Sequence, residues 1–115
     1  MSKLEHLDGT NVADFLAAPA AVLMLGKSDC EACARWTEEL EGFLASDSEW
    51  SDVRFGKLLL DKGGLIAFKR GNPWVADLDV LPFNVIYKSG EKQSEFAGSG
   101  VPRLENRLRM ILREG

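Results

Sequence analysis

The most constraining feature of the sequence is an unbroken apolar run from Ala20 to Leu25, bounded by Pro19 and Gly26. A run of this length without polar alternation is typical of a central β-strand that is covered on both faces. Polar residues follow Gly26, and apolar residues then recur at helical spacing. This spacing predicts a helix from about Cys30 to Ala45, with Trp36 on its buried face. A buried strand that leads directly into a helix favours an α/β fold.

The rest of the chain alternates in the same way, without an internal repeat or a linker. Further strands are predicted at Leu4–Leu7, Val53–Leu60, Phe83–Tyr87 and Lys92–Ala97. Further helices are predicted after an N-cap at Thr10, from Asn72-Pro73, and at the C-terminal end with apolar positions Val101, Leu104, Leu108, Ile111 and Leu112. Residues 65–70 fit either a helix or a hairpin arm. The order β-α-β-α-β-α-β-β-α implies a mixed sheet, because helical crossovers join parallel strands and a tight turn joins antiparallel ones.

Composition limits the possible roles of the chain. Its 115 residues are enough for one domain, taken as 1–115, with a single sizeable core. A net charge of −4 gives no electrostatic reason to expect nucleic acid or an anionic membrane as a partner. The first residues turn polar at once, without the apolar stretch of a secretory signal, so we expect a cytoplasmic location. A monomer is the expected state, and Trp50, between two polar neighbours, is expected to pack on the surface.

The two cysteines of the sequence, Cys30 and Cys33, are separated by two residues. A disulfide between them closes a very small loop and adds little stability, so the spacing favours chemistry over stapling. Two alternatives remain open. In the first, both cysteines are inert small apolar residues. In the second, two chains together bind zinc or an iron–sulfur cluster, because one chain offers too few ligands for such a site. We expect no metal and no cofactor.

The element order, with C-x-x-C at the start of the second helix, resembles thioredoxin over essentially the whole chain. Val80-Leu81-Pro82-Phe83 is similar to the segment of that family that contains a cis-proline before a strand. Ser89-Gly90-Glu91 and Gly98 also stand at positions where the family has corresponding residues. The resemblance implies a thioredoxin fold, with a central mixed β-sheet flanked by helices on both faces.

The position of each cysteine suggests its role. Cys30 at a helix N-terminus lies beside unpaired backbone N–H groups and the positive end of the helix dipole, which favour the thiolate nucleophile. Cys33, one turn further on, is expected to be buried and to act as the resolving thiol. The resemblance implies that Pro82 is cis and that the backbone of Leu81 pairs with an extended substrate. Trp74 is expected to line the same groove. A trans Pro82 at the start of a strand is the alternative.

The chain departs from the thioredoxin pattern at several positions. Glu31-Ala32 replaces Gly-Pro between the cysteines, and Asp29 replaces a common Trp. Met24 occupies the strand position at which thioredoxins carry a buried Asp that assists proton transfer. The carboxylates of Asp29 and Glu31 flank Cys30 and oppose its thiolate charge, which makes the pair less oxidising.

These features predict a thiol–disulfide oxidoreductase that reduces protein or small-molecule disulfides. A reductase or a low-molecular-weight thiol would recycle the Cys30–Cys33 pair. The main alternative is a thioredoxin-like binding or adaptor module that keeps the groove but has slow or no exchange chemistry. A glutaredoxin is the third reading, which the leading strand and helix before Ala20 make less favourable.

Overall fold

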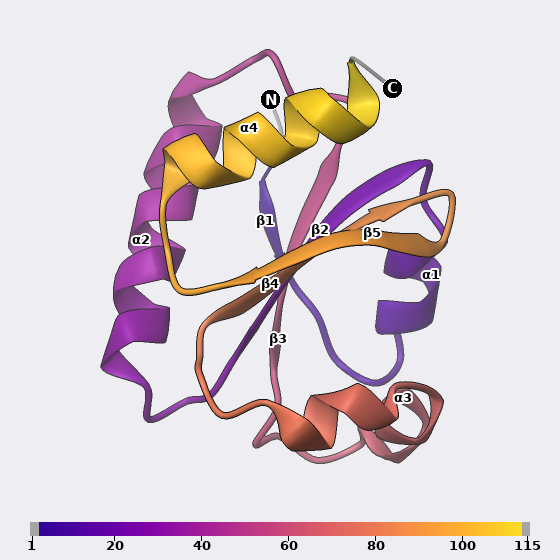
Figure 1. The fold of residues 1–115 in the computed structure, drawn as a ribbon. Helices are drawn as coiled ribbons and strands as arrows, with labels where there is room; N and C mark the ends of the chain where they lie inside the picture. The colour runs from indigo at the N-terminus through magenta and orange to yellow at the C-terminus, as the bar shows by residue number, and fades with distance from the viewer. Residues whose placement is uncertain (1–2, 114–115) are drawn as a thin grey trace.

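The computed structural model describes residues 3–113, which form one five-stranded sheet with helices on both faces (Figure 1). The strand order is β1-β3-β2-β4-β5, so β2 lies at the centre. The strands are β1 (Leu4–His6), β2 (Ala20–Gly26), β3 (Arg54–Leu59), β4 (Phe83–Lys88) and β5 (Glu91–Ala97). The helices are α1 (Val12–Leu16), α2 (Glu31–Ser46), α3 (Ile66–Gly71), the 3₁₀-helix η1 (Pro73–Asp77) and α4 (Val101–Leu112).

The sheet is mixed, as the element order predicts. β3 runs parallel to both β1 and β2, whereas β4 runs antiparallel to β2 and β5. The turn between β4 and β5 has positive φ at Ser89 (53°) and Gly90 (84°), the conformation that a two-residue hairpin requires. Met24 on β2 is opposite Asn84 on β4. This register brings the strand beneath the cysteine pair next to the strand that follows Pro82.

Two apolar clusters hold helices against the two faces of the sheet. One contains Met24 and Trp36 and joins α2 and α4 to the sheet, whereas the other contains Phe15 and Phe68 and joins α1, α3 and η1. Because successive side chains of β2 point to opposite faces, its fully apolar sequence supplies both clusters. Among the described residues, no helix has both the length and the hydropathy needed to cross a membrane.

Local structure settles or corrects several sequence predictions. The ambiguous segment at 65–70 is largely helical, as α3, and Asn72-Pro73 begins a 3₁₀-helix. Thr10 is not the N-cap of α1, which is Asn11 instead. The reason is local, because the backbone N–H and hydroxyl of Thr10 both donate to Asp8, at 2.8 Å and 2.5 Å. These bonds hold the pKa of the Asp8 carboxyl below its ordinary value.

The surface position expected for Trp50 is wrong. Its side chain is only 1% exposed and belongs to the cluster beneath α4. The indole Nε1 donates to Glu105 at 3.2 Å, and the Arg113 guanidinium lies 4.7 Å from the ring centroid. The polar neighbours of Trp50 face solvent, but the turn between α2 and β3 directs this one ring inward.

Replacing Trp50 with alanine therefore removes a core side chain. We expect Trp50→Ala to lower the free energy of unfolding by about 3–5 kcal/mol, since the loss combines apolar burial with a cavity. Ile66→Ala is the control, because Ile66 is 68% exposed, and its effect should stay within about 0.5 kcal/mol. Urea denaturation followed by circular dichroism measures both. A Trp50→Ala loss below about 1 kcal/mol would contradict the buried position.

Candidate redox site

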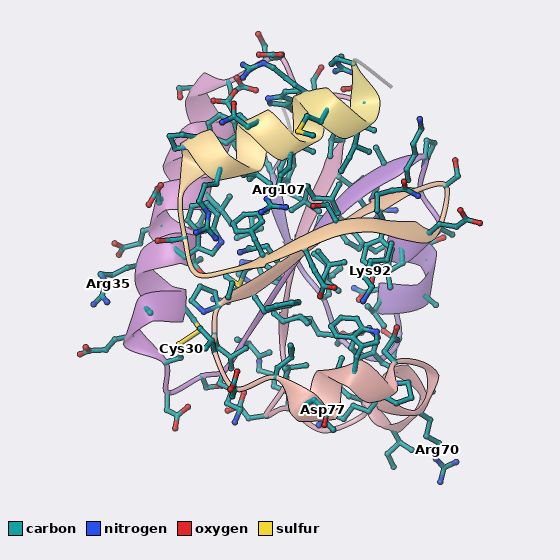
Figure 2. All side chains as sticks on the ribbon, in the orientation of Figure 1. Cys30, Arg35, Arg70, Asp77, Lys92 and Arg107 are labelled. Atoms are coloured by element: carbon teal, nitrogen blue, oxygen red, sulfur yellow. A yellow bond between two sulfur atoms is a disulfide. The ribbon has the colours of Figure 1, made fainter. Side chains whose placement is uncertain are left out.

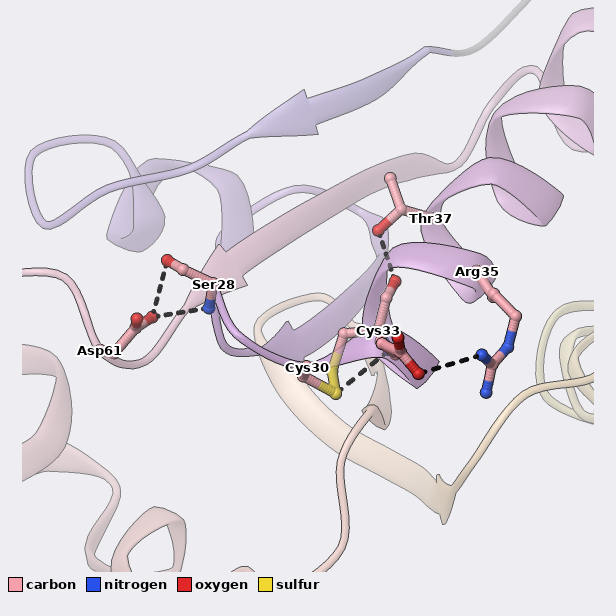
Figure 3. The surroundings of a disulfide bond; sticks show 7 residues. Ser28, Cys30, Cys33, Arg35, Thr37 and Asp61 are labelled. Atoms are coloured by element: carbon pink, nitrogen blue, oxygen red, sulfur yellow. Dashed lines mark hydrogen bonds and ion pairs between the residues drawn. A yellow bond between two sulfur atoms is a disulfide. The ribbon is translucent and has the colours of Figure 1, made fainter.

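Cys30 lies where the end of β2 leads into α2. Its backbone is extended (φ −103°, ψ 109°), and it is the N-cap of the helix. The Cys30 Sγ accepts a hydrogen bond from the Cys33 backbone N–H at 3.1 Å (Figure 3). A sulfur at this position satisfies one of the helix's unpaired donors, as a capping oxygen does elsewhere. The helix thus begins at the residue for which the sequence predicts the role of nucleophile.

Cys30 and Cys33 are joined by a disulfide, with their Cα atoms 5.2 Å apart. The two residues differ sharply in exposure, since Cys33 is 1% exposed whereas Cys30 is only half-buried. The Cys33 carbonyl also accepts the Thr37 hydroxyl at 2.8 Å. An incoming reagent therefore has better access to the sulfur of Cys30. The roles of nucleophile and resolving thiol remain predictions.

Beneath the disulfide the packing is tight and apolar. A Cβ placed on Gly26 would lie 3.1 Å from the Cys33 Sγ and 3.6 Å from the Met24 Sδ. Glycine at the end of β2 therefore lets α2 approach the sheet closely. Met24 is fully buried and belongs to the same cluster as Trp36. The thioether thus lies near the Cys33 sulfur, where it offers neither a proton nor a site to accept one readily.

The segment before β4 forms the second part of the site. The Leu81–Pro82 peptide bond is cis, in agreement with the conformation expected from the resemblance. Pro82 is buried, and its carbonyl accepts the Gly98 N–H at 2.8 Å. Within residues 3–113, no hydrogen bond engages the Leu81 backbone. Its N–H and C=O are thus free for the strand-like pairing with substrate that the resemblance implies.

Asn84 is a site residue that sequence reasoning missed. It is 1% exposed, and its Oδ1 accepts the Trp36 indole N–H at 2.7 Å. Its Nδ2 donates to the Gly98 carbonyl at 2.8 Å and to the Phe96 carbonyl at 3.3 Å. The amide thereby links α2 with the end of β5. A lone amide within the otherwise apolar run of β4 was the available signal, because a buried polar side chain needs partners.

The two acids beside Cys30 both face solvent. Glu31 is 94% exposed and lies 3.9 Å from Arg35, one turn along the helix. Asp29 is exposed in the loop before the helix. Water screens the repulsion that these carboxylates exert on a neighbouring thiolate. Arg35 further offsets part of the charge of Glu31, and we therefore expect the helix N-terminus to be the stronger influence on Cys30.

The loop before Cys30 is held to the end of β3. The Asp61 carboxylate accepts the Ser28 amide at 3.1 Å and the Ser28 hydroxyl at 3.2 Å (Figure 3). These bonds, together with the charge of Lys27, keep the pKa of Asp61 below its ordinary value. A cavity of about 560 Å³ lies at this edge of the sheet, and Leu81 contributes to its wall.

The ring of Trp74 has two close neighbours of its own. Its ring packs against Phe83, with 6.2 Å between the ring centroids, and the Lys92 ammonium lies 4.2 Å from its centroid. Trp74 is not among the residues that line the cavity beside Leu81. Its expected part in a substrate groove stays a prediction.

Among the described residues, one cluster of three acidic side chains is close enough together to hold a metal ion. Carboxylate oxygens of Asp47, Glu49 and Glu105 lie within 4.8 Å of one another. Arg109 contacts both glutamates at 3.4 Å, which balances part of their charge. The cluster follows the C-terminal end of α2, whereas Cys30 is at the other end. It therefore takes no part in the cysteine site.

Comparison with known proteins places the fold. No protein-family model and no curated protein sequence matches the chain. Among solved structures, thioredoxin f2 of Chlamydomonas reinhardtii is similar, with a TM-score of 0.74, 21% identity, and coverage of 95% of this chain and 96% of that one. Oxidised thioredoxin O2 of Arabidopsis thaliana has a TM-score of 0.74 and 19% identity, with 96% of each chain covered.

Oxidised mitochondrial thioredoxin 3 of Saccharomyces cerevisiae is also similar, with a TM-score of 0.70, 17% identity, and coverage of 93% of this chain and 94% of that one. These likenesses span nearly the full length of each protein, so the fold is shared as a whole. The chain has the thioredoxin fold, with a C-x-x-C disulfide at the N-terminus of its α2 helix.

Proposed function

We propose that the protein is a thiol–disulfide oxidoreductase that reduces disulfides through a reversible Cys30–Cys33 pair. The observation that carries this proposal is the asymmetry of the pair. The more accessible sulfur caps a helix N-terminus, and the buried sulfur lies one turn behind it. Such an arrangement is suited to a nucleophile followed by a resolving thiol.

The reaction begins from the reduced dithiol. The Cys30 thiolate attacks one sulfur of a substrate disulfide and forms a mixed disulfide, while the other substrate sulfur leaves as a thiolate and takes a proton from water. Cys33 then loses its proton and attacks the Cys30 sulfur, which releases the second substrate thiol. Two electrons pass to the substrate, and the Cys30–Cys33 disulfide remains until an external thiol or reductase reduces it.

The charges around Cys30 favour reduction of substrates over their oxidation. Unpaired N–H groups and the dipole of α2 stabilise the thiolate, but Asp29 and Glu31 add negative charge on both sides. A thiolate that is only moderately stabilised makes its disulfide less oxidising. We propose protein or small-molecule disulfides as substrates of a monomeric protein in a reducing compartment such as the cytoplasm.

Binding without exchange is the second candidate function, and Met24 is the feature that favours it. The buried thioether cannot accept the proton of Cys33, so the second step lacks an adjacent base on β2. A protein that captures a partner and releases it slowly acts as an adaptor. The Leu81 backbone would serve either function.

Reduction of insulin with dithiothreitol as the electron source tests the proposal. We expect the protein to precipitate the insulin B chain faster than dithiothreitol alone, and Cys30→Ser to abolish this acceleration. The matched variant Cys33→Ser should retain capture and accumulate the mixed disulfide, because its resolving thiol is absent. An unmutated protein no faster than dithiothreitol, or an active Cys30→Ser variant, would refute the mechanism.

Replacement of Met24 separates the two candidate functions. Met24→Asp places a carboxylate beside Cys33, and we expect release of a trapped model peptide to become at least about tenfold faster. The same change should lower stability, because it buries an ionisable group. Met24→Leu is the control for packing and should not accelerate release. Acid-quenched mass spectrometry follows the mixed disulfide, and equal acceleration by both variants would rule out a proton-transfer effect.

A further inference from the structure

The cavity of about 560 Å³ lies beside the redox site, at the edge where β2 and β3 end. Lys27, which follows β2, contributes to its wall, and the Lys27 carbonyl accepts the Cys30 N–H at 3.4 Å. On the other side the wall includes Leu81, the residue before the buried Pro82. The cavity therefore adjoins both the loop that holds the nucleophile and the backbone expected to pair with substrate.

Most of the cavity wall is apolar. Leu60 and Val75 are buried, and Leu78 and Leu81 are half-buried, so together they present aliphatic surface to an occupant. The volume falls within the range of sites that bind small ligands or peptide side chains, roughly 300–1,000 Å³. An occupant that covers this surface gains apolar burial.

The polar part of the wall carries two cations and one anion, namely Lys27, Lys69 and Asp61. The Lys69 Nζ donates to the Leu60 carbonyl at 2.9 Å, which fixes the ammonium at the cavity while two of its N–H donors remain. The Asp61 carboxylate already accepts both Ser28 donors. The net positive charge of this wall contrasts with the chain as a whole, whose net charge is −4.

We propose that this cavity is a specificity subsite for peptide disulfides in which an aliphatic and an acidic residue adjoin the reacting cysteine. The aliphatic side chain packs on Leu60, Val75 and Leu78, while the carboxylate binds Lys27 and Lys69. This inference rests on the proposed function, since it assigns the substrate class for the same cysteine pair. The exposed acids Asp29 and Glu31 beside Cys30 repel an anion, whereas Lys27 and Lys69 attract one to the cavity.

The test uses disulfide-linked homodimers of short, end-capped peptides. They contain cysteine next to Leu-Glu, Leu-Gln or Leu-Lys, with the pair either before or after the cysteine. At low salt we expect kcat/KM for one Leu-Glu peptide to exceed that of its Leu-Lys counterpart by about tenfold, and high salt to reduce the ratio. A ratio near one for both orders at low salt would overturn the proposal.

Substitutions locate the preference in the cavity. In the double variant Lys27→Gln/Lys69→Gln, the ratio of kcat/KM for the Leu-Glu peptide to kcat/KM for the Leu-Lys peptide should fall to about one. Arg70→Gln is the matched control, because Arg70 neighbours Lys69 on α3 but is not part of the cavity wall and points away from the body of the protein (Figure 2). A ratio that survives the double substitution, or disappears in Arg70→Gln, would refute the assignment.

A binding measurement separates this inference from the proposed function. The same peptides with serine in place of cysteine are titrated into the unmutated protein, and backbone amide shifts are followed by NMR. Shifts from the Leu-Glu peptide centred on Lys27, Leu60 and Val75 would support the subsite even if no peptide is reduced, in which case only the redox proposal fails. Rapid reduction without charge preference, and without such shifts, would refute the subsite alone.

Discussion

The hydrogen bond from the Cys33 N–H to the Cys30 sulfur organises the site. It makes Cys30 the N-cap of α2, and the helix geometry then places Cys33 one turn inside the helix, facing the sheet. The two sulfurs therefore have opposite environments although two residues separate them. Gly26 completes this arrangement, because a Cβ there would lie 3.1 Å from the Cys33 sulfur, which is tighter than ordinary van der Waals contact. The accessibility of Cys30, the burial of Cys33 and the position of Cys30 at the positive end of the helix dipole all follow from where α2 begins.

A buried polar network connects this helix start with the segment around Pro82. Trp36 on α2 donates to Asn84, Asn84 donates to the Gly98 carbonyl, and the Gly98 N–H donates to the Pro82 carbonyl. Each bond is short and each group is satisfied, so the network favours one arrangement of the two halves. Met24 lies within the same cluster, next to Asn84 in the register. The buried polar groups thus align α2 with β4 and β5, while the surroundings of Cys33 stay apolar.

Much of the fold follows from the sequence, because β2 is a continuous apolar run and α2 has a clear apolar stripe. The resemblance, more than any local pattern, supplied the cis bond at Pro82. Trp50, Asn84 and the cavity beside Leu81 were not predictable in the same way. The environment of Trp50 is set by α4, which is distant in sequence, and the partners of Asn84 come from α2, from β5 and from Gly98 just after β5. Contacts between residues so far apart in the sequence produce no periodic pattern from which they could be predicted.

The proposed chemistry depends most directly on Cys30 being an accessible thiol activated by a helix N-terminus. The measurement that tests it is the pH dependence of iodoacetamide labelling of each cysteine in the reduced protein, resolved by mass spectrometry. We expect a Cys30 pKa below the ordinary value of about 8.5 and labelling of Cys30 at least about tenfold faster than that of Cys33 near pH 7. Faster labelling of Cys33, or a Cys30 pKa above about 8.5, would contradict it.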